Sequence, residues 1–204
     1  MKRLPVSMRA RLRRPERRRS PFAVPAGVRQ AQLSGEPLFE GVSVFHDNEW
    51  AALEAFCPHV VIGDRTRLQR LAEDARNGEV DISSVDRAIL AATPCGAPPI
   101  DDVLRVVLWQ TFGVPVYELL ISADGRLLGT DCEAQEGWHL EPGFQAFFAG
   151  RELVITTDGE PAIHTGLAAQ LSHQPCACGR AGSLILRPER LRRLAPARRW
   201  AATA

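Results

Sequence analysis

Three cysteines and one histidine in the second half of the chain have the residue types of a structural metal site. Cys176 and Cys178 form a Cys-x-Cys pair, and Gly179 lets the backbone turn so that its amides face the thiolates. Cys132 lies in an expected strand, and His139 follows across a short turn. A hairpin would bring Cys132 and His139 together, and the Cys-x-Cys turn would complete a tetrahedral Cys3His set, as in structural Zn2+ sites.

The spacing alone leaves a second interpretation open. Cys-x-Cys is less specific than paired Cys-x-x-Cys motifs, so the three thiols could be unrelated core residues and the histidine a surface side chain. Five cysteines, an odd number, argue against a disulfide framework and favour a cytoplasmic protein with reduced thiols. We expect the other two cysteines, Cys57 and Cys95, to be ordinary buried thiols.

The elements that must position these residues alternate between strand and helix in the first half of the chain. Continuous apolar runs predict strands over residues 41–45, 59–63, 88–92 and 114–122. A cap at Asp47 and Asn48 predicts a helix over residues 49–56. Helical spacing, with a glycine as the stop signal, predicts helices over residues 66–77 and 100–112. In the last helix we expect the apolar side chains to face inward, namely Val103, Val106, Val107 and Trp109.

The second half has a different pattern. Short strands are expected over residues 127–132, 138–140 and 152–157, with no helix between the first two. The fold class is therefore α/β, a parallel α/β unit followed by a small mixed β region that carries the metal site.

Four stretches of sequence occur in a specific order, FGVPVYEL at 112–119, DCEAQEGWHL at 131–140, GRELVITT at 150–157 and QPCACGR at 174–180. On these strings, residues 41–186 resemble the phenylacetate–coenzyme A ligase branch of the adenylate-forming enzymes. The resemblance implies a partial adenylate-forming-enzyme fold. It also implies a structural zinc held by Cys132, His139, Cys176 and Cys178.

The positions that align with the nucleotide motifs of that family have changed. Its Tyr-Gly-x-Thr/Ser-Glu motif aligns with residues 120–124, where Ser122 and Asp124 are remnants. Its Arg-x-Gly-Asp motif aligns with residues 164–167, where Thr165 and Gly166 remain and Leu167 replaces the ribose-binding carboxylate. The phosphate loop would precede residue 42, and the catalytic lysine of the lid has no counterpart, since the chain's single lysine is Lys2. The comparison predicts no catalytic residue and no intact cofactor-binding set, and hence a pseudoenzyme.

Basic side chains are concentrated at the two ends of the chain. Residues 1–19 hold nine of the 25 and residues 187–199 hold six, whereas residues 20–186 hold 22 of the 24 acidic side chains. We expect an Arg-rich tail and linker over residues 1–40, the linker and loop running over 21–37, the ligase-like domain over 41–186 and a basic tail or short helix over 187–204. Such ends could lie on an acidic partner or bind nucleic acid.

These observations favour a non-catalytic, zinc-stabilised subunit or scaffold that acts in a hetero-complex with another protein. A split acyl-CoA ligase completed by a partner chain is the first alternative, and an Arg-rich nucleic-acid-binding protein is the second. No apolar run approaches the length of a membrane span, so no membrane partner is expected. We expect the docking surface on the strand 114–122, through Leu120 and Ile121, and near Leu167.

Overall fold

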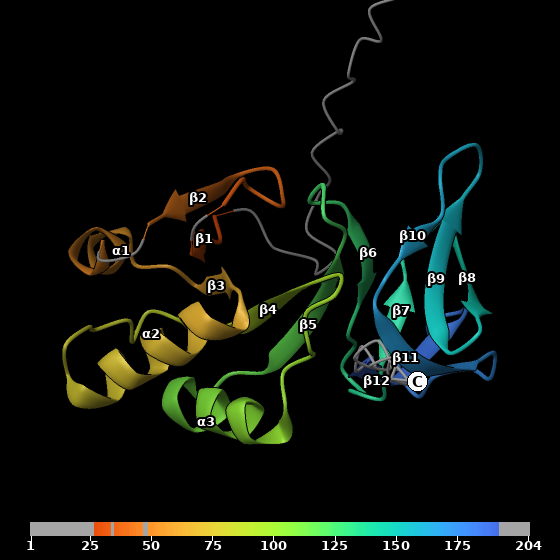
Figure 1. The fold of residues 1–204 in the computed structure, drawn as a ribbon. Coiled ribbons are helices and arrows are strands. Elements are labelled where there is room, and N and C mark those ends of the chain that lie inside the picture. Colours follow the sequence, from red (N-terminus) through yellow and green to blue (C-terminus); the bar gives the residue numbers. More distant parts are fainter. Residues whose placement is uncertain (1–26, 34, 47–48, 192–204) are drawn as a thin grey trace, which may run out of the picture.

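The computed structural model describes residues 27–33, 35–46 and 49–191, and its centre is one large sheet (Figure 1). In spatial order, the strands of this sheet are β11 (Leu167–Ser172), β12 (Leu184–Arg190), β7 (Trp138–Leu140), β6 (Leu127–Thr130), β5 (Val116–Ile121), β4 (Ala88–Pro94), β3 (Val60–Gly63), β1 (Gln30–Leu33) and β2 (Val42–Phe45). Strands β5, β4, β3, β1 and β2 pair in parallel with their neighbours in this group. The other four strands of the sheet, β6, β7, β12 and β11, pair antiparallel, and β6 also pairs antiparallel with β5. The expected α/β unit followed by a mixed β region is confirmed.

Helices cover one face of the parallel strands. The helices are α1 (Trp50–Phe56), α2 (Arg65–Asn77) and α3 (Asp102–Phe112), and α2 and α3 lie side by side (Figure 1). Helix α2 begins at an Asp64 cap and ends at Gly78, whose φ of 76° is in the left-handed region that glycine adopts without strain. Leu68 and Leu71 of α2 pack with Leu104 and Leu108 of α3 in the core below the sheet.

A second, smaller sheet packs against the antiparallel half. Its antiparallel strands are β10 (Ile163–His164), β9 (Glu152–Thr157) and β8 (Phe144–Ala149). Leu153 and Ile155 of β9 are fully buried in one cluster with Trp138 and Ile185 of the large sheet. This cluster fixes the small sheet next to the strands that carry the cysteines and the histidine.

The exposed face of α3 contradicts the sequence prediction. Val103, Val106 and Trp109 were expected to face inward, yet they are 74%, 49% and 58% exposed. The buried residues are Leu104 and Leu108, which lie one turn apart, and Val107 is partly buried beside them. Apolar residues occupy both faces of this helix, so the sequence pattern did not identify the buried one.

Two segments predicted as irregular or helical are strands. Within residues 21–37, expected as linker and loop, Gln30–Leu33 form β1 between β3 and β2. The polar side chain of Gln32 is buried there because it donates to Glu36 O (2.7 Å) and accepts from Leu38 N (2.9 Å). Residues 187–190, expected as tail or helix, continue β12. The Arg-rich stretch 1–19 and residues 192–204 lie outside the described residues.

Other expectations concern single residues. Cys57 is exposed rather than buried, and Cys95 is partly buried, where burial raises the pKa of its thiol to about 11. Leu120 and Leu167, expected at an exposed docking surface, are both 0% exposed in the core between the two sheets. Among the described residues, no helix is long and apolar enough to cross a membrane.

Candidate metal centre

The predicted cysteines and histidine converge in one place. The Sγ atoms of Cys132 and Cys176 are 3.6 Å apart, and Cys178 Sγ lies 3.3 Å from His139 Nε2. All four candidate ligand atoms lie within 4.8 Å of one another. A tetrahedral site with metal–sulfur bonds of about 2.3 Å separates two sulfurs by about 3.8 Å, so these separations fit a metal ion bound by all four side chains.

Backbone geometry explains the convergence. Thr130 of β6 pairs with His139 of β7, and Cys132 follows β6 directly, so the predicted hairpin places Cys132 near His139. The Cys-x-Cys turn precedes β12, which pairs with β7 at His139. In the β6–β7 turn, a Cβ atom on Gly137 would lie 2.2 Å from Ile185 O of β12, so only glycine permits this approach.

The Cys-x-Cys turn and its surroundings affect the protonation of the candidate ligands. The backbone N–H of Arg180 donates to Cys178 Sγ (3.5 Å) and lowers the pKa of that thiol. Burial and the nearby Arg180 lower the pKa of His139 and favour the neutral imidazole, the form that binds metals. An N–H of Cys178 favours the thiolate of Cys176, but burial and neighbouring sulfurs raise its pKa to about 12. A metal cation at this position would stabilise the buried thiolate.

A buried network of charged side chains holds the backbone of Cys132, and the sequence did not predict it. Asp131 Oδ1 accepts the backbone N–H of Cys132 (3.0 Å), and Asp131 Oδ2 lies 3.2 Å from Arg105 Nη1. Arg105 of α3 also donates to Val116 O (2.6 Å) and lies 3.8 Å from Glu118 Oε2. Burial raises the pKa of both Glu118 and Asp131. Glu118 and Asp131 lie in two of the stretches that resemble the ligase family, 112–119 and 131–140. Their place in these stretches was the signal in the sequence that could have identified them.

The remnant residues of the first nucleotide motif bond to one another. Ser122 Oγ donates to Asp124, and Arg126 N donates back to Ser122 Oγ (2.9 Å). The Arg126 side chain pairs with Asp124 (3.0 Å) and with Glu160. These side chains therefore close the turn between β5 and β6.

The remnants of the second motif are also used within the fold. Thr165 is buried, and its hydroxyl donates to Leu153 O (2.7 Å) and accepts from Leu167 N (3.2 Å). Gly166 N donates to Glu152 Oε1 (2.8 Å), and a Cβ on Gly166 would lie 3.1 Å from Gly96 Cα. The backbone N–H of Gly96, in the turn after β4, also donates to Thr165 O (2.6 Å), so these two loops contact each other through their backbones. The structure does not bring these remnants to the metal cluster as ligands, since the cluster consists of the four predicted residues.

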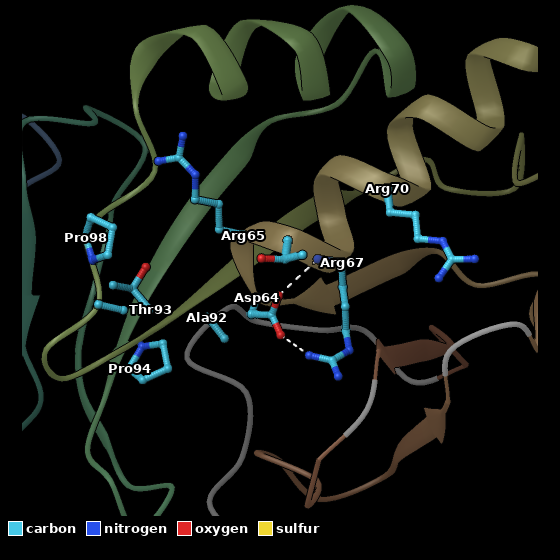
Figure 2. A pocket seen from close by; sticks show the side chains of 10 residues that line it. Asp64, Arg65, Arg67, Arg70, Ala92, Thr93, Pro94 and Pro98 are labelled. Atoms are coloured by element: carbon cyan, nitrogen blue, oxygen red, sulfur yellow. Dashed lines mark hydrogen bonds and ion pairs between the residues drawn. The ribbon is translucent and has the colours of Figure 1, made fainter.

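A cavity of about 600 Å³ opens where β3 and β4 end, beside the start of α2 (Figure 2). Ligands of open α/β sheets often bind at such an edge. Figure 2 shows Arg65, Arg67 and Arg70 on its wall, pointing in different directions. Each pairs with a carboxylate of the same protein, these being Asp101, Asp64 and Asp74, respectively. Asp64 also caps α2, so its own carboxylate occupies the helix N-terminus.

The fold is similar to that of several solved protein structures. No protein-family model and no curated protein matches the chain. Among solved structures it is similar to 2-hydroxyisobutyryl-CoA ligase in complex with 2-HIB-AMP and CoA (TM-score 0.58, 13% identity, 78% of this chain, 45% of that chain). It is also similar to VinN (TM-score 0.54, 11% identity, 78% of this chain, 50% of that chain). A third similar structure is coronafacic acid ligase from Pectobacterium brasiliense (TM-score 0.51, 13% identity, 78% of this chain, 39% of that chain).

The chain therefore has part of the fold of the adenylate-forming acyl-CoA ligases. It spans half or less of the length of these ligase-like structures. At such low identity the similarity establishes the fold, and the chemistry has to be argued from the site itself.

Proposed function

We propose that the chain is a non-catalytic, zinc-stabilised subunit or scaffold, related to the phenylacetate–coenzyme A ligase branch, that acts in a protein complex. The observation that carries this proposal is the position of Leu167. In the resembling family this position holds the carboxylate that binds ribose, whereas here it is an apolar side chain, 0% exposed, in the core between the sheets. A buried leucine offers no hydrogen bond to a nucleotide.

Zinc would have a structural role in this proposal. Cys132 follows β6, His139 lies in β7, and Cys176 and Cys178 precede β12, so one ion would join three strands of the antiparallel half. Four protein ligands complete a tetrahedral site and leave no position for a substrate. The chemistry that the ion would supply is therefore the stabilisation of thiolates and of the fold.

The exposed face of α3 supports a protein partner. Val103, Val106 and Trp109 are large apolar side chains on one exposed helix face, and Val106 and Trp109 line a cavity of about 560 Å³. Contiguous apolar surface on a folded domain is typical of docking sites. Tryptophan is enriched among the residues that dominate protein–protein affinity.

The test of complex membership is purification of the tagged chain from its native source, with Trp109→Ser as the variant. We expect a stoichiometric protein partner with the unaltered chain and its loss with the variant, since the variant removes the largest apolar group of the α3 face. Val28→Ser is the matched control, because Val28 packs on the opposite face of the sheet. Recovery of the chain alone at low salt would contradict the proposal.

A split acyl-CoA ligase is the second candidate. The fold similarity favours it, because 78% of this chain matches 45% of 2-hydroxyisobutyryl-CoA ligase, which leaves room for a partner to supply the remainder. The two candidates differ in one measurable property. A split enzyme would catalyse ATP–pyrophosphate exchange with a carboxylic acid in the purified complex, and a scaffold would not.

A further inference from the structure

A metal ion has restricted access to the four-residue cluster. Cys132, His139 and Cys176 are buried, and Cys178 is partly exposed. The surroundings of Cys178 and of Cys176 therefore decide how an ion reaches the ligand atoms. These two surroundings carry opposite charges.

The side of Cys178 carries a positive charge. The backbone N–H of Arg180 donates to Cys178 Sγ (3.5 Å), and the guanidinium of Arg180 donates to Thr130 Oγ1 (3.1 Å). Thr130 is the residue that pairs with His139 in the sheet. Burial and then the charge of Arg180 lower the pKa of His139. A cation held at this position repels an incoming Zn2+.

The side of Cys176 carries a negative charge. Glu136 lies in the β6–β7 turn and is exposed, and its Oε2 atom is 3.5 Å from Cys176 Sγ. Its charge also reaches His139, where it raises the pKa against the effects of burial and of Arg180. The close approach of Gly137 to Ile185 O holds this turn against β12. A fixed carboxylate thus stands at the edge of the cluster, on the side away from the cation.

A cavity of about 330 Å³ opens beside this carboxylate. Leu184 forms part of its wall and packs with Cys132 and Cys176, so the cavity adjoins the cluster. A water molecule takes about 30 Å³ of liquid volume, and the cavity therefore has room for an ion with several of its waters. The residues that line it are Glu136, Ser172, Gln174, Pro175, Leu184 and Leu186.

The separation of the carboxylate from the sulfur fits a shared cation. Bonds of about 2.0–2.2 Å from zinc to oxygen and about 2.3 Å from zinc to sulfur, at a tetrahedral angle, place the two atoms about 3.6 Å apart. Glu136 Oε2 and Cys176 Sγ are 3.5 Å apart, and Cys176 Sγ is 3.6 Å from Cys132 Sγ. Cys176 can therefore share an ion with the carboxylate or with the other ligands.

We propose that Glu136 and Cys176 form an entry site, from which a metal ion passes to the four-residue cluster. This inference rests on the zinc site proposed above. The exposed carboxylate binds the hydrated ion first, and Cys176 joins it as the second ligand. The ion then gives up its bond to Glu136 and its remaining waters as the other three protein ligands bind. Glu136 stays outside the final site, because four protein ligands complete a tetrahedral coordination.

Metal exchange in the zinc-loaded full chain tests the entry site. Cd2+ is added in excess, and the ultraviolet absorption of cadmium–thiolate bonds reports its uptake. Glu136→Gln should slow the exchange at least about tenfold, because a charged cleft raises the local ion concentration and the association rate by about 10–10³. Glu133→Gln is the matched control, since it removes an exposed carboxylate from the same turn. The control should exchange at the rate of the unaltered chain.

Equilibrium measurements separate an entry residue from a permanent ligand. Glu136→Gln should keep one zinc per chain and melt within about 2 °C of the unaltered chain, because the final ligands are unchanged. Equal exchange rates of the two variants, or loss of zinc from Glu136→Gln, would overturn the entry site alone. An unaltered chain without zinc would overturn the zinc site itself, and this inference with it.

Discussion

The zinc site makes a quantitative prediction for the variant Cys178→Ser. Zinc would link Cys132 to Cys176, which are 44 residues apart in the chain. A covalent link that closes a loop of this length stabilises a protein by about 4 kcal/mol in the chain-entropy model. With a shift of about 2–4 °C per kcal/mol for a chain of this size, loss of the ion should lower the melting temperature by about 8–16 °C.

The assay combines elemental analysis with thermal unfolding of the purified full chain. We expect one zinc per unaltered chain and none after Cys178→Ser, with the loss in melting temperature given above. Cys57→Ser is the matched control, because Cys57 is an exposed thiol of the first half and lies outside the cluster. The reasoning would be refuted if the unaltered chain held less than half an equivalent of zinc and the three cysteine thiols of the cluster were freely alkylated. So would melting temperatures of the two variants within about 2 °C of each other.

Three further predictions concern the core and the buried charges. Leu167→Ala should lower the free energy of unfolding by about 2–5 kcal/mol in urea denaturation, because it empties a fully buried position. Arg105→Met should lower it by about 3–5 kcal/mol and weaken zinc retention against a chelator, because Glu118 and Asp131 lose their cation. Burial raises the pKa of Glu118, so the folded state binds its proton more tightly than the unfolded state. The free energy of unfolding should therefore fall as the pH rises from about 4.5 through the raised pKa, and the fall should be smaller with Glu118→Gln.

Local sequence signals predicted the helices and the cysteine–histidine hairpin because the physics at those positions is local. Helix α2 has amphipathic spacing and a glycine at its end, and each lies within a few residues of the feature that it determines. The β6–β7 hairpin likewise depends on a short turn. The spacing of the residues alone left two interpretations of the cysteines open. The prediction that the Cys-x-Cys pair binds the same metal ion as this hairpin therefore rested on the resemblance to the ligase family.

The missed features depend on contacts between distant segments. Strand β1 contains two glutamines, and it is buried only because β3 and β2 pair with it on both sides and local backbone groups satisfy Gln32. Strand β12 forms because β7 and β11 flank it. Helix α3 has apolar residues on both faces, and the packing of α2 and β5 decides which face is buried. The Arg105 network joins α3 to β5 and to Asp131, which directly follows β6, and no local signal in the sequence indicated these contacts.

We propose that the residues aligned with nucleotide motifs serve the fold, and that the chain therefore has no adenylate-forming chemistry of its own. The direct measurement is ATP–pyrophosphate exchange by the purified, zinc-replete chain with a panel of aryl and fatty acids. We predict no exchange above background, because Leu167 is in the core and Asp124 is bonded to Ser122 and Arg126. Exchange above background that Asp124→Ala abolishes would contradict this account.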